Sequence, residues 1–186
     1  MNQDRPTPPP PPPKSAAPGR DARAPLSPRT WLALAGWLAL AFVAAAVGSV
    51  ASVQAPQFYG QLTQPAWAPP AWLFGPVWST LYAMMGIAAW LVWREPAGPV
   101  RQRGLVLFCV QLALNALWSW LFFQWHLGAW ALADIALLWA CVAATLASFW
   151  RLRPLAGALL VPYLAWITFA AALNFTVWRL NPQLLG

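Results

Sequence analysis

The residues best suited to chemistry are aromatic and amide side chains that recur at helical spacing within long apolar runs. Positions three, four, seven or eleven residues apart share one face of a helix. Three such stripes are Trp78, Tyr82 and Met85; Gln111, Asn115, Trp118 and Phe122; and Tyr163, Trp166, Ala170 and Asn174. Aromatic rings stack on flat π systems, and amides supply directional hydrogen bonds. The stripes therefore predict a mostly apolar small-molecule pocket with few polar groups.

Other kinds of chemistry have little support in the sequence. It contains no P-loop, GxGxxG, HExxH or GxSxG pattern. Cys109 and Cys141 lie within apolar runs and are predicted to pack rather than to form a disulfide or bind metal. His126, the single histidine, is expected to be a solvated loop residue, with haem ligation as the alternative. No metal site and no firm catalytic residue is predicted.

Tryptophans also anchor proteins at membrane surfaces, which is the alternative explanation for the stripes. That role accounts for the tryptophans near the ends of the apolar runs, namely Trp31, Trp72, Trp90, Trp93, Trp125, Trp130, Trp150 and Trp178. Trp78, Tyr82, Trp118 and Trp166 lie deeper and align with the amides, which favours a pocket. Gln111 and Asn115 also fit a second role as hydrogen-bonding contacts between helices.

Composition identifies the class of protein that must position these side chains. Of 186 residues, 60% are hydrophobic and 8% are charged, which is too little polarity for a water-soluble domain and too much apolarity for a disordered chain. The net charge of +7 comes from a tail and short loops rather than from a basic patch, so nucleic-acid binding is not expected. A multi-pass membrane protein remains.

Five apolar segments of 22 to 24 residues predict an all-α membrane protein, a bundle of five transmembrane helices. Such lengths span the roughly 30 Å hydrocarbon core, whereas barrel strands are shorter and alternate. The expected spans are about 31–53, 72–93, 104–125, 129–150 and 155–178. Residues 1–29 form a Pro-rich basic tail expected to be disordered, residues 30–181 the membrane domain, and residues 182–186 a C-terminal tail. A cleaved signal peptide is the less favoured interpretation of the first span.

The connections between the spans predict where a ligand would bind. Segment 54–71 is long, uncharged and rich in proline and aromatic residues, including Tyr59 and Trp67, which is typical of a lid or binding loop. The other connections are short and make neighbouring helices antiparallel.

Some residues within the spans leave two interpretations open. Asp134, in the second turn of the fourth span, is expected to be solvated and stabilised by the helix dipole, with pairing to the pocket or proton sensing as the alternative. Pro162 should kink the last span. The stripe Ala44, Gly48 and Ser52 fits helix packing or a homodimer interface.

Several blocks of the sequence, in the same order, resemble the tryptophan-rich sensory protein family, TspO, whose animal members are the translocator proteins or peripheral benzodiazepine receptors. The matching blocks cover about residues 31–181 and run from Tyr59 through Trp67 and Trp72 to Trp78 and Tyr82, from Asn115 through Trp118 to Phe123, from Ala131 to Asp134, from Pro162 to Trp166, and from Leu173 to Arg179. The tail lies outside the resemblance.

The resemblance implies a five-helix bundle, often dimeric, with a pocket beneath segment 54–71 that binds porphyrins, haem among them, or similar planar apolar ligands. No cofactor is required. The ligand-binding residues it implies are Tyr59, Trp78, Tyr82, Asn115, Trp118, Trp166 and Ala170, and weaker candidates are Trp67, Gln111, Asp134, Tyr163 and Asn174. In animal members a sterol motif requires a tyrosine where this chain has Phe175, which puts sterol binding in doubt.

Three functions are compatible with these expectations. The first is a sensory or regulatory membrane protein that binds a tetrapyrrole. The second is an enzyme that degrades bound porphyrin in light, with Trp78 and Trp166 as the catalytic electron donors. The third is a transporter of tetrapyrroles or lipids, which the absence of an internal sequence repeat disfavours. The Ala-, Pro- and Arg-rich tail indicates a bacterial cell membrane.

The distribution of basic residues predicts the orientation of the chain. Ten of the eleven Lys and Arg residues lie in the tail and in the second and fourth connections, and Arg179 alone lies on the other side. Because positive residues stay cytoplasmic, the N-terminus is expected inside and the C-terminus outside. A reporter enzyme that works only outside the cytoplasm should be active when fused after Gly186. Activity there from a reporter that works only in the cytoplasm would contradict this topology.

Overall fold

The computed structural model describes residues 27–186, and every regular element in that range is helical. The α-helices are α1 Pro28–Ala51, α2 Ala55–Gln61, α3 Phe74–Trp93, α4 Pro99–Ser119, α5 Gly128–Leu152, α6 Pro154–Leu180 and α7 Pro182–Leu185. A 3-10 turn, Ala71–Leu73, leads into α3, and a π-helical turn, Trp120–Gln124, follows α4. Five helices are long and apolar enough to cross a membrane, which confirms the predicted fold class. The tail predicted for residues 1–29 lies outside the described residues up to residue 26.

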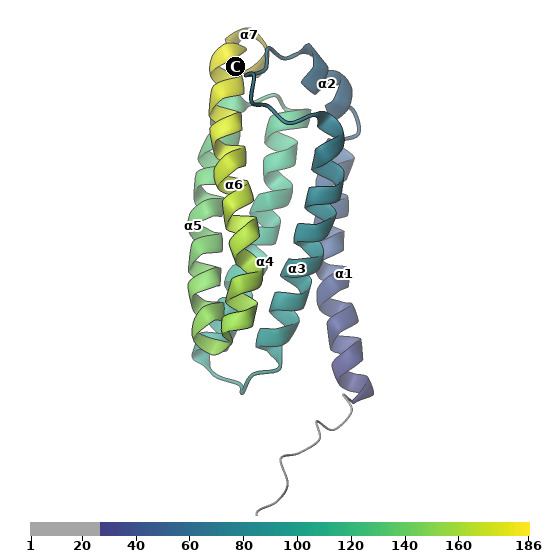
Figure 1. Cartoon of the computed structure of the whole chain (residues 1–186), viewed down its shortest axis with the longest axis vertical. Coiled ribbons are helices and arrows are strands. Elements are labelled where there is room, and N and C mark those ends of the chain that lie inside the picture. Colours follow the sequence, from purple (N-terminus) through teal and green to yellow (C-terminus); the bar gives the residue numbers. More distant parts are fainter. Residues whose placement is uncertain (1–26) are drawn as a thin grey trace, which may run out of the picture.

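The five long helices form a closed ring in which each lies between two others. Going round the ring, the order is α1, α3, α6, α5 and α4, and α4 packs against α1 again (Figure 1). The short connections between α4, α5 and α6 make these three consecutive helices neighbours, as the sequence predicts. One large apolar cluster runs through the ring, and a second, smaller cluster lies at the end where α2 and α7 are found.

Several helices begin at a proline, because the first helical position needs no backbone N–H and the fixed φ of proline suits it. Pro28, Pro99, Pro154 and Pro182 are the first residues of α1, α4, α6 and α7. As a result α1 and α4 begin three and five residues before the expected spans. Arg29 therefore belongs to the first turn of α1 rather than to the tail.

Two segments without a predicted helix, the connection 54–71 and the C-terminal residues 182–186, each contain a helix. Segment 54–71 contains the helix α2, which shortens the irregular part of the connection. Residues 182–185 form α7 rather than an extended tail, because the side chain of Leu185 is fully buried in the smaller apolar cluster. Pro162 lies inside α6, and the helix continues through it.

Close contact between α5 and α6 depends on a glycine next to their short connection. A Cβ atom built on Gly157 would lie 2.9 Å from the backbone Cα of Trp150, nearer than two carbon atoms can pack. Gly36, inside α1, has no atom within 4 Å of the same position. The two glycines therefore form a matched pair of sites for testing helix packing.

We expect Gly157→Ala to destabilise the protein by about 1–3 kcal/mol, because the added methyl group must push the two helix backbones apart. Gly36→Ala should leave the stability unchanged or raise it, since alanine is the better helix former. Thermal unfolding in detergent, followed by tryptophan fluorescence, measures both. Equal unfolding temperatures for the two variants would contradict the close approach at Gly157.

Candidate ligand-binding pocket

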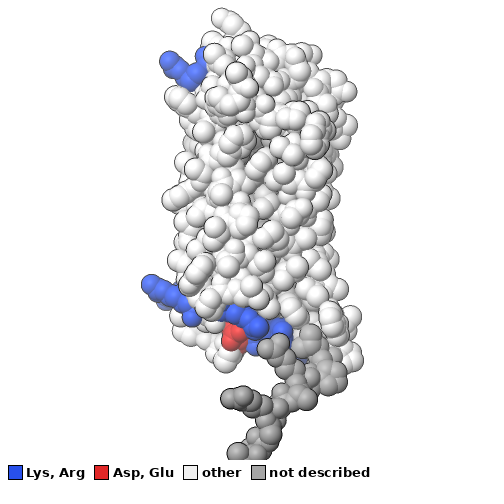
Figure 2. All heavy atoms as spheres, viewed as in Figure 1, with Lys and Arg blue, Asp and Glu red and all other residues white. Residues whose placement is uncertain are grey.

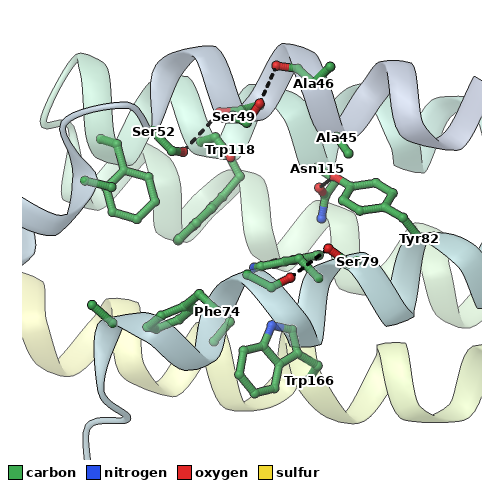
Figure 3. Close-up of a pocket in the computed structure, with 18 of the residues that line it drawn as sticks. Ala45, Ala46, Ser49, Ser52, Phe74, Ser79, Tyr82, Asn115, Trp118 and Trp166 are labelled. Carbon is green, nitrogen blue, oxygen red and sulfur yellow. Dashed lines mark hydrogen bonds between the residues drawn. The ribbon is translucent and has the colours of Figure 1, made fainter.

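A cavity of about 570 Å³ lies inside the ring, near the end capped by α2. Its walls come from the second half of α1, the first half of α3, the last turns of α4 and the middle of α6, and α2 supplies part of its roof (Figure 3). The residues that form it are Phe42, Ala45, Ala46, Gly48, Ser49, Ser52, Ala55, Pro56, Tyr59, Ala71, Phe74, Gly75, Trp78, Ser79, Tyr82, Asn115, Trp118, Ser119, Phe123, Trp166 and Ala170. The volume is within the usual range for small-molecule sites.

The structure brings together all seven of the stronger candidates on the wall of this one cavity, although they lie on four separate elements. They are Tyr59, Trp78, Tyr82, Asn115, Trp118, Trp166 and Ala170. That these side chains bind a ligand stays a prediction.

The weaker candidates do not line the cavity, and two of them form a second layer behind its wall. Asn115 accepts a hydrogen bond from the Tyr82 hydroxyl and donates one to the Tyr163 hydroxyl at 3.1 Å. The indole of Trp118 donates to Asn174 Oδ1 at 3.1 Å. Tyr163 and Asn174 are thus buried residues that fix the orientation of Asn115 and Trp118.

The remaining weaker candidates lie elsewhere. Trp67 is half-exposed and meets Phe169 edge-on, with ring centroids 5.7 Å apart. Gln111 and Asp134 are buried, and Gln111 Oε1 and Asp134 Oδ2 accept no hydrogen bond from the described residues. The expectation of a solvated Asp134 was wrong, because packing within the bundle leaves its side chain 8% exposed.

Aromatic side chains in edge contact make the α3 and α6 walls of the cavity rigid. Trp78 meets Tyr163 and Trp166 nearly at right angles, with centroid distances of 6.2 and 6.5 Å. Phe74 contacts Tyr59 and Trp166 in the same way, at 5.8 and 6.0 Å. Edge-to-face pairs of this kind are favourable, so these rings hold one another in place.

One polar group on the wall has no partner in the protein. Trp166 Nε1 is inaccessible to water and donates no hydrogen bond to any described residue. In Figure 3 the nitrogen lies on the side of the indole that faces the cavity. A buried N–H without an acceptor is costly. Because water does not reach this nitrogen, a ligand in the cavity does not reach it either.

Apart from Phe42, the α1 wall consists of small residues that sequence analysis did not assign to the pocket. Ala45, Gly48, Ser49 and Ser52 recur at helical spacing. The Ser49 hydroxyl donates to the Ala46 carbonyl at 2.8 Å, and that of Ser52 to the Gly48 carbonyl at 3.0 Å. Both hydroxyls are therefore satisfied within their own helix, which leaves a smooth wall of low polarity.

The small-residue stripe on α1 has an identifiable partner within the chain. A Cβ atom on Gly48 would meet Ser119 Oγ at 3.2 Å and the backbone of Ala116 at 3.8 Å, so Gly48 packs against α4. Phe42, Phe74 and Phe123 also line the cavity and were not predicted. The spacing of Ala45, Gly48 and Ser52 was the signal that could have identified the α1 wall.

Three residues considered for other chemistry lie away from the cavity wall. His126 has a φ of 56° and stacks on Phe58, with ring centroids 4.1 Å apart, so it supports the chain reversal before α5. Cys141 is buried and its thiol lies 3.4 Å from the Leu107 carbonyl, while Cys109 is exposed.

Burial raises the pKa of the Tyr59 phenol in α2, which keeps the hydroxyl of this roof residue protonated.

Comparison with known proteins agrees with the geometry of the bundle and its tryptophans. Residues 31–179 match the TspO/MBR family. The human translocator protein is 44% identical over 127 residues, which is 67% of this chain and 75% of that protein. Protein CrtK of Rhodobacter capsulatus is 43% identical over 147 residues, covering 77% of this chain and 92% of that protein. The tryptophan-rich protein TspO of Chlorobaculum tepidum is 43% identical over 145 residues, covering 74% and 90%. The chain therefore belongs to the TspO/MBR family of multi-pass membrane proteins.

Proposed function

We propose that this protein binds a planar, largely apolar ligand of the porphyrin class in the cavity beneath α2 and has a sensory or regulatory role. The observation that carries the proposal is a cavity of about 570 Å³ whose walls combine aromatic rings from three helices with few polar groups. A relative from Cereibacter sphaeroides, 42% identical over 126 residues, is named a tryptophan-rich sensory protein, which supports the sensory role.

The shape and chemistry of the walls fit a flat ring system. Trp78, Trp118 and Trp166 come from α3, α4 and α6 and present indole surfaces to the same space. Each aromatic pair is worth about 0.5–1.5 kcal/mol beyond the burial of apolar area. The small residues of α1 leave room opposite these rings, so a broad, thin molecule can lie between the two walls.

The polar groups fit a ligand with acceptor atoms at its edge. Asn115 uses its oxygen for Tyr82 and one amide hydrogen for Tyr163, which leaves one amide hydrogen without a partner among the described residues. The wall carries no charged side chain, so apolar ligands with few polar groups are favoured over highly charged ones.

We also propose that the N-terminus is cytoplasmic, in a bacterial cell membrane. Most of the arginines in the described residues gather at one end of the bundle, around the connections near Glu95 and Arg153, and Arg179 lies at the other (Figure 2). Arg153 pairs with Glu95 at 3.2 Å. This orientation places the cavity in the extracytoplasmic half of the membrane.

The binding site is tested by replacing both cavity tryptophans with phenylalanine. We expect Trp78→Phe with Trp166→Phe to weaken protoporphyrin binding by about tenfold, because the variant loses stacking area on two walls. Quenching of the remaining tryptophan fluorescence by protoporphyrin, titrated with purified protein in detergent, measures the affinity.

A control variant removes two tryptophans that do not touch the cavity. Trp31 and Trp130 are more than half exposed on the outside of the bundle. Trp31→Phe with Trp130→Phe should bind like the unaltered protein. Equal affinity in the cavity variant and the control, with saturable quenching in both, would place the ligand elsewhere.

Illumination separates binding from turnover. The enzymatic alternative requires Trp78 and Trp166 to act as electron donors, and their rings are in contact beside the cavity. We expect the absorption band of bound protoporphyrin to decay under light no faster with the unaltered protein than with the Trp78→Phe, Trp166→Phe variant, at ligand concentrations that saturate both. Decay that needs the two indoles would favour the enzyme.

A further inference from the structure

The roof of the cavity is attached to the bundle at one polar contact. The cap segment, residues 54–70, joins α1 to the helical turn before α3 and includes α2. Within the described residues, its hydrogen bonds to anything beyond its own flanks all involve Asn181, at the end of α6. Tyr59 and Gln64 form hydrogen bonds only within the cap segment, to Pro69 and Tyr59 respectively.

Asn181 binds the main chain of Thr63 as a neighbouring strand would. The backbone N–H of Thr63 donates to Asn181 Oδ1 at 2.8 Å, and Asn181 Nδ2 donates to the Thr63 carbonyl at 2.9 Å. The second hydrogen on Nδ2 goes to the Val177 carbonyl at 2.7 Å. The amide thus uses its oxygen and both hydrogens, and it is buried, so it has a single favourable orientation.

Apolar packing beside the contact between Thr63 and Asn181 also stabilises it. Leu62 is buried in the smaller cluster together with Val177 and Leu185. α7 is folded back against α6, where the Trp178 indole donates to the Gly186 carbonyl at 3.0 Å. Asn181 also accepts backbone hydrogen bonds from Leu184 and Leu185 at 3.1 Å, so the residue that holds Thr63 also begins α7.

Beyond Thr63 the cap segment has three further contacts: the hydrogen bond from Tyr59 to Pro69 within the segment, and the packing of Ala68 and of Trp67. Its next aromatic residue, Trp67, is half-exposed and contacts the bundle through the edge of Phe169. Segments with few buried contacts and few hydrogen bonds open most readily. The stretch from Thr63 to Pro70 therefore depends on the Asn181 contact to remain closed.

We propose that Asn181 is a positioning residue that holds the cap segment over the cavity and limits the rate at which ligand enters and leaves. The kinetic half of this proposal rests on ligand binding in the cavity; the closure of the cap does not. If ligand passes only through an open cap, loss of the Asn181 contact speeds entering and leaving together, and the equilibrium affinity changes little, because the cavity wall is unaltered.

The closure is tested without ligand, by hydrogen exchange of the full chain in detergent. The Ala68 amide donates to the Pro65 carbonyl at 2.9 Å and does not bond to Asn181. Asn181→Ala should raise the exchange rate of this amide by about tenfold, since each lost hydrogen bond contributes about 1 kcal/mol. Gln183→Ala is the matched control, because Gln183 is an exposed amide side chain two residues away in α7. Unchanged exchange in Asn181→Ala relative to Gln183→Ala would overturn the proposal.

The gating is tested by stopped-flow quenching with protoporphyrin. Asn181→Ala should raise the association and dissociation rate constants by about tenfold each and leave the dissociation constant within about threefold. Faster exchange with unchanged rate constants would mean that ligand passes between the helices, which overturns the gating. A chain that binds no protoporphyrin refutes the proposed function, and the exchange experiment then still decides whether Asn181 closes the cap.

A second variant serves if Asn181→Ala does not fold. Asn181→Asp keeps the oxygen that accepts from Thr63 and loses both donated hydrogen bonds. We expect faster exchange and larger rate constants than in Gln183→Ala, because a carboxylate cannot donate to the Thr63 carbonyl. Exchange and rate constants equal to those of Gln183→Ala would count against the proposal.

Discussion

The structure depends on one constraint, which is that polar groups inside a membrane protein must find their hydrogen-bond partners within the protein. The amide of Asn115 meets it for three helices at once, since it joins Tyr82 of α3 and Tyr163 of α6 to α4. This contact lies on the wall of the cavity, where the ring of helices widens. Below it the bundle is filled by tightly packed apolar side chains, and above it the same helices enclose the open space.

The same constraint explains why the cavity is aromatic rather than charged. A charged side chain facing an apolar cavity would be costly at membrane depth, whereas an indole presents a flat apolar surface and a single donor. Trp118 satisfies its donor through Asn174, which in turn donates to the Gly128 carbonyl at the start of α5. Trp166 does not satisfy its donor. The Trp166 ring lines the cavity, whereas its nitrogen is closed off from it, so a ligand can contact the ring surface and not the donor.

Much of this arrangement could be predicted from the sequence because helical periodicity is a local property. Helical spacing placed three pairs of residues on one helix face each, namely Trp78 with Tyr82, Asn115 with Trp118, and Trp166 with Ala170. In the structure these three faces surround one cavity. The prolines that begin α1, α4 and α6 could have corrected the predicted helix starts. The burial of Asp134 could not be derived, because it depends on which neighbouring helices cover that turn.

The contact between Thr63 and Asn181 shows where a single sequence stops being informative. The two residues are 118 positions apart, and the sequence around each of them gives no indication of the contact. An asparagine just after a helix is ordinarily a capping residue, which conceals its second contact. The cavity wall is built from repeated spacings within helices, whereas its roof is held by one long-range pair. The features that select a ligand and those that control its access therefore reside in separate parts of the chain, and either can change without the other.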